Sequence, residues 1–168
     1  MNEEKFSAWL VAIGTVLSAI ANTPSSVLSD SVQEDLDLVG SVLQAVGSGI
    51  IPADAEYREQ VGGRIEALGD IVTIQSLFVE DERTSGLLNA QGNLIQAVGT
   101  GLALNLEDNQ TVNEALNTIG DVLQMIGNIY IAFSTKYPPD SKKAQELNTV
   151  GGWIEATGAV LSALTVDS

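Results

Sequence analysis

Two glutamates at equivalent positions of an internal repeat are the residues best placed to do acid–base chemistry. Glu66 lies in GGRIEALG and Glu155 in GGWIEATG, and two facing carboxyl groups can act as a general acid and a general base. The other copies of the repeat carry serine or glutamine at this position: Ser18, Gln44, Gln96 and Gln124. Because the position falls on the polar stripe of a predicted helix, we expect Glu66 and Glu155 to be solvated rather than catalytic.

The chain lacks the side chains that most often perform catalysis or hold a metal. It contains no histidine and no cysteine, which removes the commonest general base, the commonest metal ligand and any thiol nucleophile. Three acidic clusters could attract calcium, although none has the ligand spacing of an EF-hand: Glu34-Asp35-Asp37, Glu80-Asp81-Glu82 and Glu107-Asp108. We therefore predict a protein that is not an enzyme and has no cofactor and no metal site.

The net charge of −15 limits the partners that the protein can have. A nucleic-acid-binding surface needs clustered lysine and arginine, whereas the seven basic residues of this chain are scattered. The same negative charge disfavours adsorption to an anionic membrane surface. We expect no nucleic-acid partner. A membrane or lipid partner is an open alternative that the net charge disfavours.

The N-terminal segment has some features of a targeting sequence. An uncharged run extends from Phe6 to Ala21, which is shorter than the ~20 residues of a membrane span. Glu3 and Glu4 precede it in place of the positive cluster of a signal peptide. We predict a cytoplasmic protein, with secretion without a cleaved signal peptide as the open alternative.

An eight-residue motif recurs six times and begins with glycine in every copy. The copies read GTVLSAIA, GSVLQAVG, GGRIEALG, GNLIQAVG, GDVLQMIG and GGWIEATG. Their apolar residues recur with helical spacing and do not alternate as they would in a strand. At about 100° per residue, the two glycines of a copy lie along one edge of a broad apolar face.

Glycine at these fixed positions indicates close packing between helices. Each glycine in a helix costs about 1 kcal/mol relative to alanine, so the repeated glycines need a compensating contact. A role in flexibility would predict scattered positions. We predict a helix-packing seam formed by Gly14, Gly40, Gly47, Gly62, Gly69, Gly92, Gly99, Gly120, Gly127, Gly151 and Gly158.

The predicted fold class is all-α, with six antiparallel helices built from the repeated motif G-x-x-[LI]-x-A-x-G in a single domain over residues 1–168. The likeness of VGGRIEALG to VGGWIEATG suggests a duplicated three-helix unit with halves 1–80 and 81–168. The true period stays open, because LQAVGSGI matches IQAVGTGL better still. Aromatic side chains are expected to anchor the core, namely Trp9, Tyr130, Phe133 and Trp153.

The segments WLVAIGTVLSAIANTP and WIEATGAVLSAL resemble a family of uncharacterised repetitive helical proteins from spore-forming Gram-positive bacteria. The resemblance spans all six copies of the motif. It implies no activity, ligand or functional site, and it favours a non-enzymatic role in a bacterial cell.

Three functions follow as expectations. The first is a structural or self-associating protein whose spare apolar faces join copies into a homo-oligomer or polymer. The alternative is an amphipathic protein that lies on lipid or inserts into a membrane as a toxin or pore former does, which small-residue seams favour. The third is a helical bundle that binds an apolar small molecule.

Overall fold

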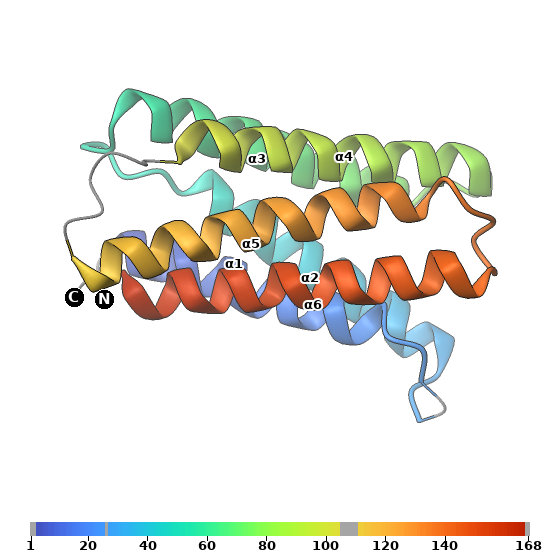
Figure 1. Cartoon of the computed structure of the whole chain (residues 1–168). Coiled ribbons are helices and arrows are strands. Elements are labelled where there is room, and N and C mark those ends of the chain that lie inside the picture. Colours follow the sequence, from blue (N-terminus) through green and yellow to red (C-terminus); the bar gives the residue numbers. More distant parts are fainter. Residues whose placement is uncertain (1–2, 26, 105–110, 167–168) are drawn as a thin grey trace.

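Six α-helices lie side by side in a bundle about as long as one helix (Figure 1). The computed structural model describes residues 3–25, 27–104 and 111–166, and no strand occurs among them. The all-α prediction is therefore confirmed. In chain order the helices are α1 (Glu3–Ala21), α2 (Asp30–Gly49), α3 (Tyr57–Ser76), α4 (Glu82–Ala103), α5 (Val112–Ser134) and α6 (Lys142–Thr165).

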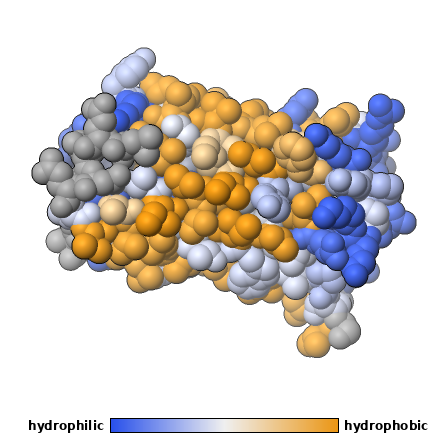
Figure 2. Space-filling model, in the orientation of Figure 1, coloured by the Kyte–Doolittle hydropathy of each residue, from blue (hydrophilic) through white to orange (hydrophobic). Residues whose placement is uncertain are grey.

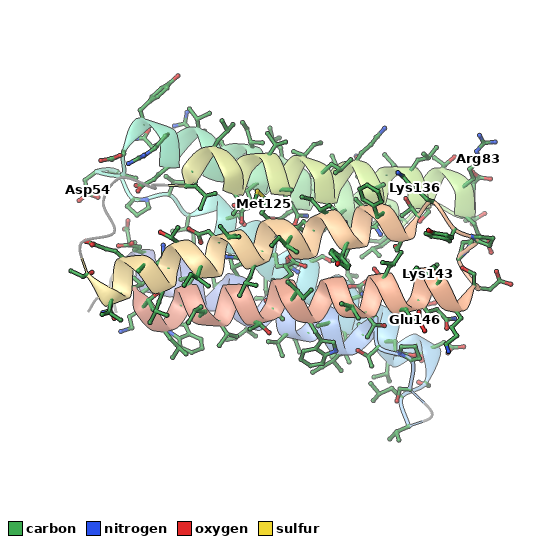
Figure 3. All side chains as sticks on the ribbon, in the orientation of Figure 1. Asp54, Arg83, Met125, Lys136, Lys143 and Glu146 are labelled. Atoms are coloured by element: carbon green, nitrogen blue, oxygen red, sulfur yellow. The ribbon has the colours of Figure 1, made fainter. Side chains whose placement is uncertain are left out.

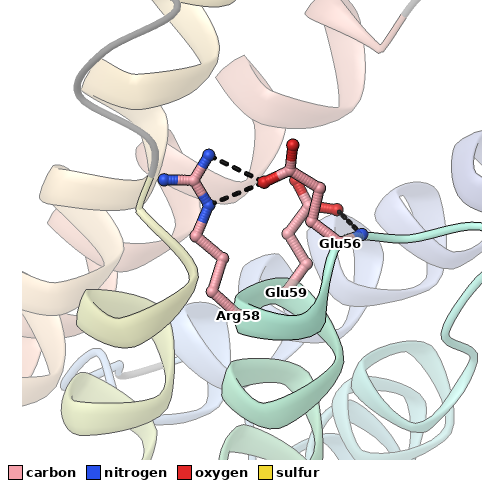
Figure 4. Close-up of polar contacts among 3 residues, drawn as sticks. All are labelled: Glu56, Arg58 and Glu59. Atoms are coloured by element: carbon pink, nitrogen blue, oxygen red, sulfur yellow. Dashed lines mark hydrogen bonds and ion pairs between the residues drawn. The ribbon is translucent and has the colours of Figure 1, made fainter.

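Local capping interactions fix where several helices begin. At the start of α5, the Thr111 hydroxyl accepts a hydrogen bond from the Glu114 backbone, while the Thr111 backbone N–H donates to the Glu114 carboxylate. Glu56 and Glu59 form the same reciprocal arrangement at α3, where Arg58 also pairs with Glu56 at 2.8 Å (Figure 4). These contacts satisfy backbone N–H groups that the first turn of a helix leaves without partners.

Consecutive helices pair into three hairpins, α1–α2, α3–α4 and α5–α6, in which glycines bring the backbones together. A Cβ atom built on Gly62 would lie 2.6 Å from the carbonyl oxygen of Gly99, and one on Gly69 would lie 2.7 Å from that of Gly92. This register is that of two helices running in opposite directions. A backbone atom of the partner helix comes within 3.0 Å of such a Cβ position at Gly14, Gly40, Gly47, Gly62, Gly69, Gly92, Gly99, Gly120, Gly127, Gly151 and Gly158.

The three hairpins close into a ring. Besides the partners within each hairpin, α2 contacts α3, α4 contacts α5, and α6 returns to α1, and these neighbours account for the helix contacts of the described residues. The structural repeat is therefore the two-helix hairpin, and the boundary between the expected halves 1–80 and 81–168 falls inside the α3–α4 hairpin. The glycine pairs explain this difference, because they hold consecutive helices together most closely.

The interior of the ring is polar and its outer surface is apolar. Alanines are the only hydrophobic residues among the described ones that are fully buried, and the buried polar residues outnumber them. These polar residues are Thr15, Ser41, Gln44, Asp70, Ser76, Asn93, Gln96, Thr100, Gln124, Asn128, Ser134, Glu155, Ser162 and Thr165. Close glycine seams leave room inside only for small or slender side chains, so the bulky aliphatic residues among the described ones stay at least partly exposed.

The aromatic residues do not form the expected core. Tyr130, Phe133 and Trp153 each expose 40% or more of their surface, and Trp9 is half-buried. The prediction that they anchor the core is wrong for the first three, because the seam turns the opposite face of each helix inward. Figure 2 shows apolar side chains covering the middle of one face of the molecule, with hydrophilic residues gathered toward an end.

Charged side chains outside the ring gather at the ends of the helices. Six of the seven basic residues lie within three residues of a helix end, and Arg64 is the exception. Figure 3 shows Asp54 at one end of the bundle, and Arg83, Lys136 and Lys143 at the other. The molecule therefore has an apolar waist between two charged ends.

Candidate functional site

The hairpin repeat stacks equivalent polar residues inside the ring. Gly14, Gly69 and Gly127 face partner glycines in the three hairpins, so the residues that follow them are equivalent. Those residues are Thr15, Asp70 and Asn128, and all three are at least 97% buried. Each odd-numbered helix thus turns one polar side chain toward the centre directly beside its glycine.

A second layer comes from the even-numbered helices. Four residues after the seam glycines Gly40, Gly92 and Gly151, the chain carries Gln44, Gln96 and Glu155 in equivalent places, all of them buried. The expectation that this position of the motif is solvated is therefore wrong. The glycines of each helix face the inside of the ring, and they bring the polar side chains beside them inside as well. The sequence had predicted a buried apolar face there instead.

A cavity of about 200 Å³ lies in the interior, and all six helices contribute to its wall. Two carboxyl groups line it, those of Asp37 and Glu155. Amide and hydroxyl side chains form most of the remaining wall: Ser18, Asn22, Ser41, Gln44, Thr73, Ser76, Ser85, Asn89, Asn93, Gln96 and Asn148. None of the described residues that line this cavity is basic.

A larger cavity of about 650 Å³ adjoins the first at one end of the bundle. Five residues line both cavities, namely Asn22, Ser85, Gly86, Asn89 and Asn148. The outer wall is formed around the start of α4 and the connection between α5 and α6, and it includes the charged pair Glu82 and Arg83. The outer cavity is therefore a mouth that leads to the polar interior.

Acidic groups continue beyond the inner cavity. Glu66 accepts hydrogen bonds from Ser48 at 3.4 Å and from Thr100 at 3.2 Å. Asp121 accepts one from Ser162 at 3.1 Å. These hydrogen bonds hold the carboxyl groups of Glu66 and Asp121 in place inside the bundle.

The interior holds five carboxyl groups and no positive charge among the described residues. They belong to Asp37, Glu66, Asp70, Asp121 and Glu155, and Glu155 lies within electrostatic reach of both Glu66 and Asp37. The ion pairs of Arg58 with Glu56 and of Lys142 with Glu146 both lie elsewhere. Buried negative charge without a positive partner is costly, and a buried carboxyl group avoids this cost by taking up a proton.

Among the described residues, two buried acceptor oxygens have no hydrogen-bond partner. They are Oδ2 of Asp70 and Oδ1 of Asn128, at equivalent positions of two hairpins. Asp70 is 3% exposed and lies within electrostatic reach of Glu66 and Glu155. Each of these oxygens could accept a hydrogen bond from a buried water molecule.

Sequence reasoning singled out Glu66 and Glu155 but missed Asp70, Asp121 and Asp37 as interior residues. The structure brings Glu66 and Glu155 into one electrostatic cluster. Asp70 could have been found from its place directly after the seam residue Gly69. No three acidic side chains among the described residues come together as a metal ion would require, and the acidic pair Glu107-Asp108 lies outside those residues.

Residues 2–163 match the family of unknown function DUF6944. The chain belongs to this family. No curated protein and no solved structure matches it.

One helix of the described residues, α1, is long and apolar enough by itself to cross a membrane. It lies near the N-terminus, and 28% of its apolar window is buried in the bundle. The other five helices have a lower mean hydropathy because each of them turns polar side chains inward. The mean hydropathy of a whole helix therefore underestimates how apolar its outer face is.

Proposed function

We propose that the protein is a membrane-embedded helical barrel that provides a polar compartment within the lipid. The observation that carries this proposal is the reversal of polarity, with acidic and amide side chains inside and large aliphatic side chains outside. Ionisable residues within membrane segments face the bundle interior or a water-filled cavity, as Asp70 and Glu155 do in this ring, and Arg64, which is exposed on α3, is an exception.

The apolar surface surrounds the ring, which favours lipid as the partner. Exposed large hydrophobic residues occur on every helix, for example Ile13 on α1, Val42 on α2, Leu68 on α3, Val98 on α4, Ile119 on α5 and Leu164 on α6. A second copy of the chain would cover one side of such a surface. Lipid would cover all sides.

The dimensions of the barrel match a bilayer. The helices contain 19 to 24 residues. At about 1.5 Å per residue they are roughly 28–36 Å long, and the hydrocarbon core of a membrane is about 30 Å thick. Glycine seams also suit a membrane, since small residues allow helices to pack closely where no hydrophobic effect drives them together.

Exposed aromatic residues near the helix ends give further support. Tyr57 begins α3, Phe78 follows it, and Tyr130 and Phe133 lie in the last turns of α5. Such positions correspond to the interfaces of a membrane, where aromatic side chains are enriched. The proposal places the chain in a membrane rather than in the cytoplasm, and we extend it to a bacterial membrane on the resemblance stated above.

Self-association is the second candidate, because copies could cover part of the same apolar surface. An oligomer would then be the working form, with or without lipid. A bundle for an apolar ligand finds less support, since polar residues predominate in the walls of the two cavities described here.

Quenching of tryptophan fluorescence by brominated lipid tests the proposal. The variant Trp9→Phe leaves Trp153, which is 42% exposed on α6, as the single tryptophan. Reconstituted into neutral vesicles, it should be quenched by lipid brominated on the acyl chain and not by iodide in the water. Quenching by iodide alone, with the protein failing to float with the vesicles, would refute the proposal.

A further inference from the structure

We infer that the interior cavity binds a small neutral solute rich in hydroxyl groups, of the size of glycerol, through Ser41, Asn93 and Gln96. The inference rests on the proposed function in that it names the solute for which the barrel provides a compartment. Its argument comes from the polar groups of the cavity wall, so it can fail independently of insertion into lipid.

Three deeply buried side chains of the cavity wall have polar atoms that no described residue engages. Ser41, Asn93 and Gln96 line the cavity and are 5%, 4% and 5% exposed. The amide nitrogens of Asn93 and Gln96 donate to Asn89 and Thr73, respectively. The amide oxygens of Asn93 and Gln96 accept no hydrogen bond from the described residues, and the Ser41 hydroxyl forms none with them.

These free atoms are open to a solute and are not sealed in the packing. Among the described residues, the sealed buried atoms without a partner are Oδ2 of Asp70 and Oδ1 of Asn128. The free oxygens of Ser41, Asn93 and Gln96 are therefore reachable from the cavity that these residues line. A buried polar group without a partner is costly, and a molecule bound in the cavity would remove that cost.

The chemistry of the wall selects a neutral solute with several hydroxyl groups. Amide oxygens accept hydrogen bonds, whereas a serine hydroxyl both donates and accepts, as each hydroxyl group of a polyol also does. None of the described residues that line the cavity is basic, so an anion would meet the carboxyl groups of Asp37 and Glu155 without a compensating charge. A neutral polyol needs no charged partner, and these carboxyl groups can also accept hydrogen bonds from it.

Hydrogen bonds between wall residues hold the site in shape. The side-chain nitrogen of Asn148 donates to Oδ1 of Asn22 at 3.0 Å, and that of Asn22 donates to Oδ1 of Asp37 at 3.0 Å. The side-chain nitrogen of Asn93 donates to Oδ1 of Asn89 at 2.9 Å. Because these amides are already fixed, binding a solute orders few further side chains and costs little conformational entropy.

Size and access also fit a small polyol. The inner cavity has a volume of about 200 Å³, and one water molecule takes about 30 Å³, so the cavity holds several waters or one small solute. The outer cavity of about 650 Å³ joins it through Asn22, Asn89 and Asn148. A solute of the size of glycerol can therefore enter by the mouth and reach the free groups inside.

Two substitutions in α4 and one in α2 test the site. Gln96→Met keeps the length of the side chain and removes its free amide oxygen. Gln91→Met is the matched control, because Gln91 is exposed on the same helix and lines neither cavity. Ser41→Ala removes the free hydroxyl without breaking a hydrogen bond, so it serves where loss of the bond from Gln96 to Thr73 disturbs folding.

Saturation-transfer-difference NMR measures the binding of glycerol to the purified protein in neutral detergent, with empty micelles as the blank. The wild-type protein and Gln91→Met should reach half-saturation at the same glycerol concentration. Gln96→Met and Ser41→Ala should each raise that concentration about twofold to tenfold, as loss of one hydrogen bond does. Circular dichroism shows whether each variant is folded.

Three results would overturn the inference. One is no transfer to glycerol from the folded wild-type protein, which would mean that the cavity holds water alone. The second is an unchanged half-saturating concentration in the folded Gln96→Met and Ser41→Ala variants, and the third is an equal rise in Gln91→Met, since glycerol would then bind elsewhere. Tryptophan quenching in vesicles is measured separately, so a lipid-embedded protein that binds no glycerol would refute the polyol site and leave the proposed function standing.

Discussion

Two alanine substitutions in α4 test whether the glycine seam holds the hairpins together. A Cβ atom added at Gly99 would lie 2.6 Å from the backbone nitrogen of Glu66 and 2.7 Å from the carbonyl oxygen of Gly62. Ordinary van der Waals contact begins near 3.4 Å. The helices α3 and α4 would have to separate by about 1 Å, because backbone atoms cannot rotate away as a side chain can.

The position of Gly86 provides the control. A Cβ atom there meets nothing within 4 Å, so Gly86→Ala should gain the helical preference of alanine, about 1 kcal/mol, without a clash. Gly99→Ala gains the same preference and adds the overpacking cost, about 1–3 kcal/mol. The free energy of unfolding of the two variants should therefore differ by about 1–3 kcal/mol, with Gly99→Ala the less stable.

Unfolding by sodium dodecyl sulfate from neutral detergent, followed by circular dichroism, measures this difference. The comparison uses the same substitution on the same helix, so helix propensity cancels. Equal stability of Gly86→Ala and Gly99→Ala would show that the close approach of α3 and α4 does not exist in the protein.

Two further predictions concern charged groups outside the interior. Hydrogen bonds from the Thr84 side chain and backbone hold the pKa of Asp81 below its ordinary value, so this carboxylate stabilises the start of α4 above about pH 4. As the pH falls through the lowered pKa, the wild-type protein should lose stability that Asp81→Ala lacks at every pH, and acid unfolding curves of the two measure this. Arg64 is an exposed charge in the middle of α3, where the α5 repeat carries Val122. Arg64→Val should raise the fraction of protein that floats with neutral vesicles, because an arginine at the centre of a membrane segment opposes insertion. Arg83→Val, at the start of α4, should leave that fraction unchanged.

Helix content and close glycine positions could be read from the sequence because both depend on local spacing. The heptad interval between Gly62 and Gly69 predicts one face of a helix whatever that face contacts. The choice between a two-helix and a three-helix unit could not be made in this way. Several copies of the motif match one another almost equally, and only the contact of Gly69 with Gly92 decides the pairing.

The sequence-based prediction was wrong about which face of each helix is turned toward the centre of the bundle. Amphipathic periodicity shows that a helix has two faces but not which of them is turned to the centre. Gln44, Gln96 and Glu155 were placed in solvent on the rule that water-soluble proteins bury their apolar face. The glycines near these residues could have predicted their burial, because side chains next to a close contact between two helices lie inside the bundle.

Reactivity of single cysteines in lipid vesicles tests the central claim most directly, because the natural chain has none. Ser85→Cys places a thiol in the wall shared by both cavities, and Val98→Cys places one on the outer surface of α4, where the native side chain is 56% exposed. If lipid covers the waist and water fills the mouth, a charged methanethiosulfonate reagent should modify Ser85→Cys and spare Val98→Cys. Faster modification of Val98→Cys would show that the apolar surface faces water, and it would contradict the membrane-embedded barrel.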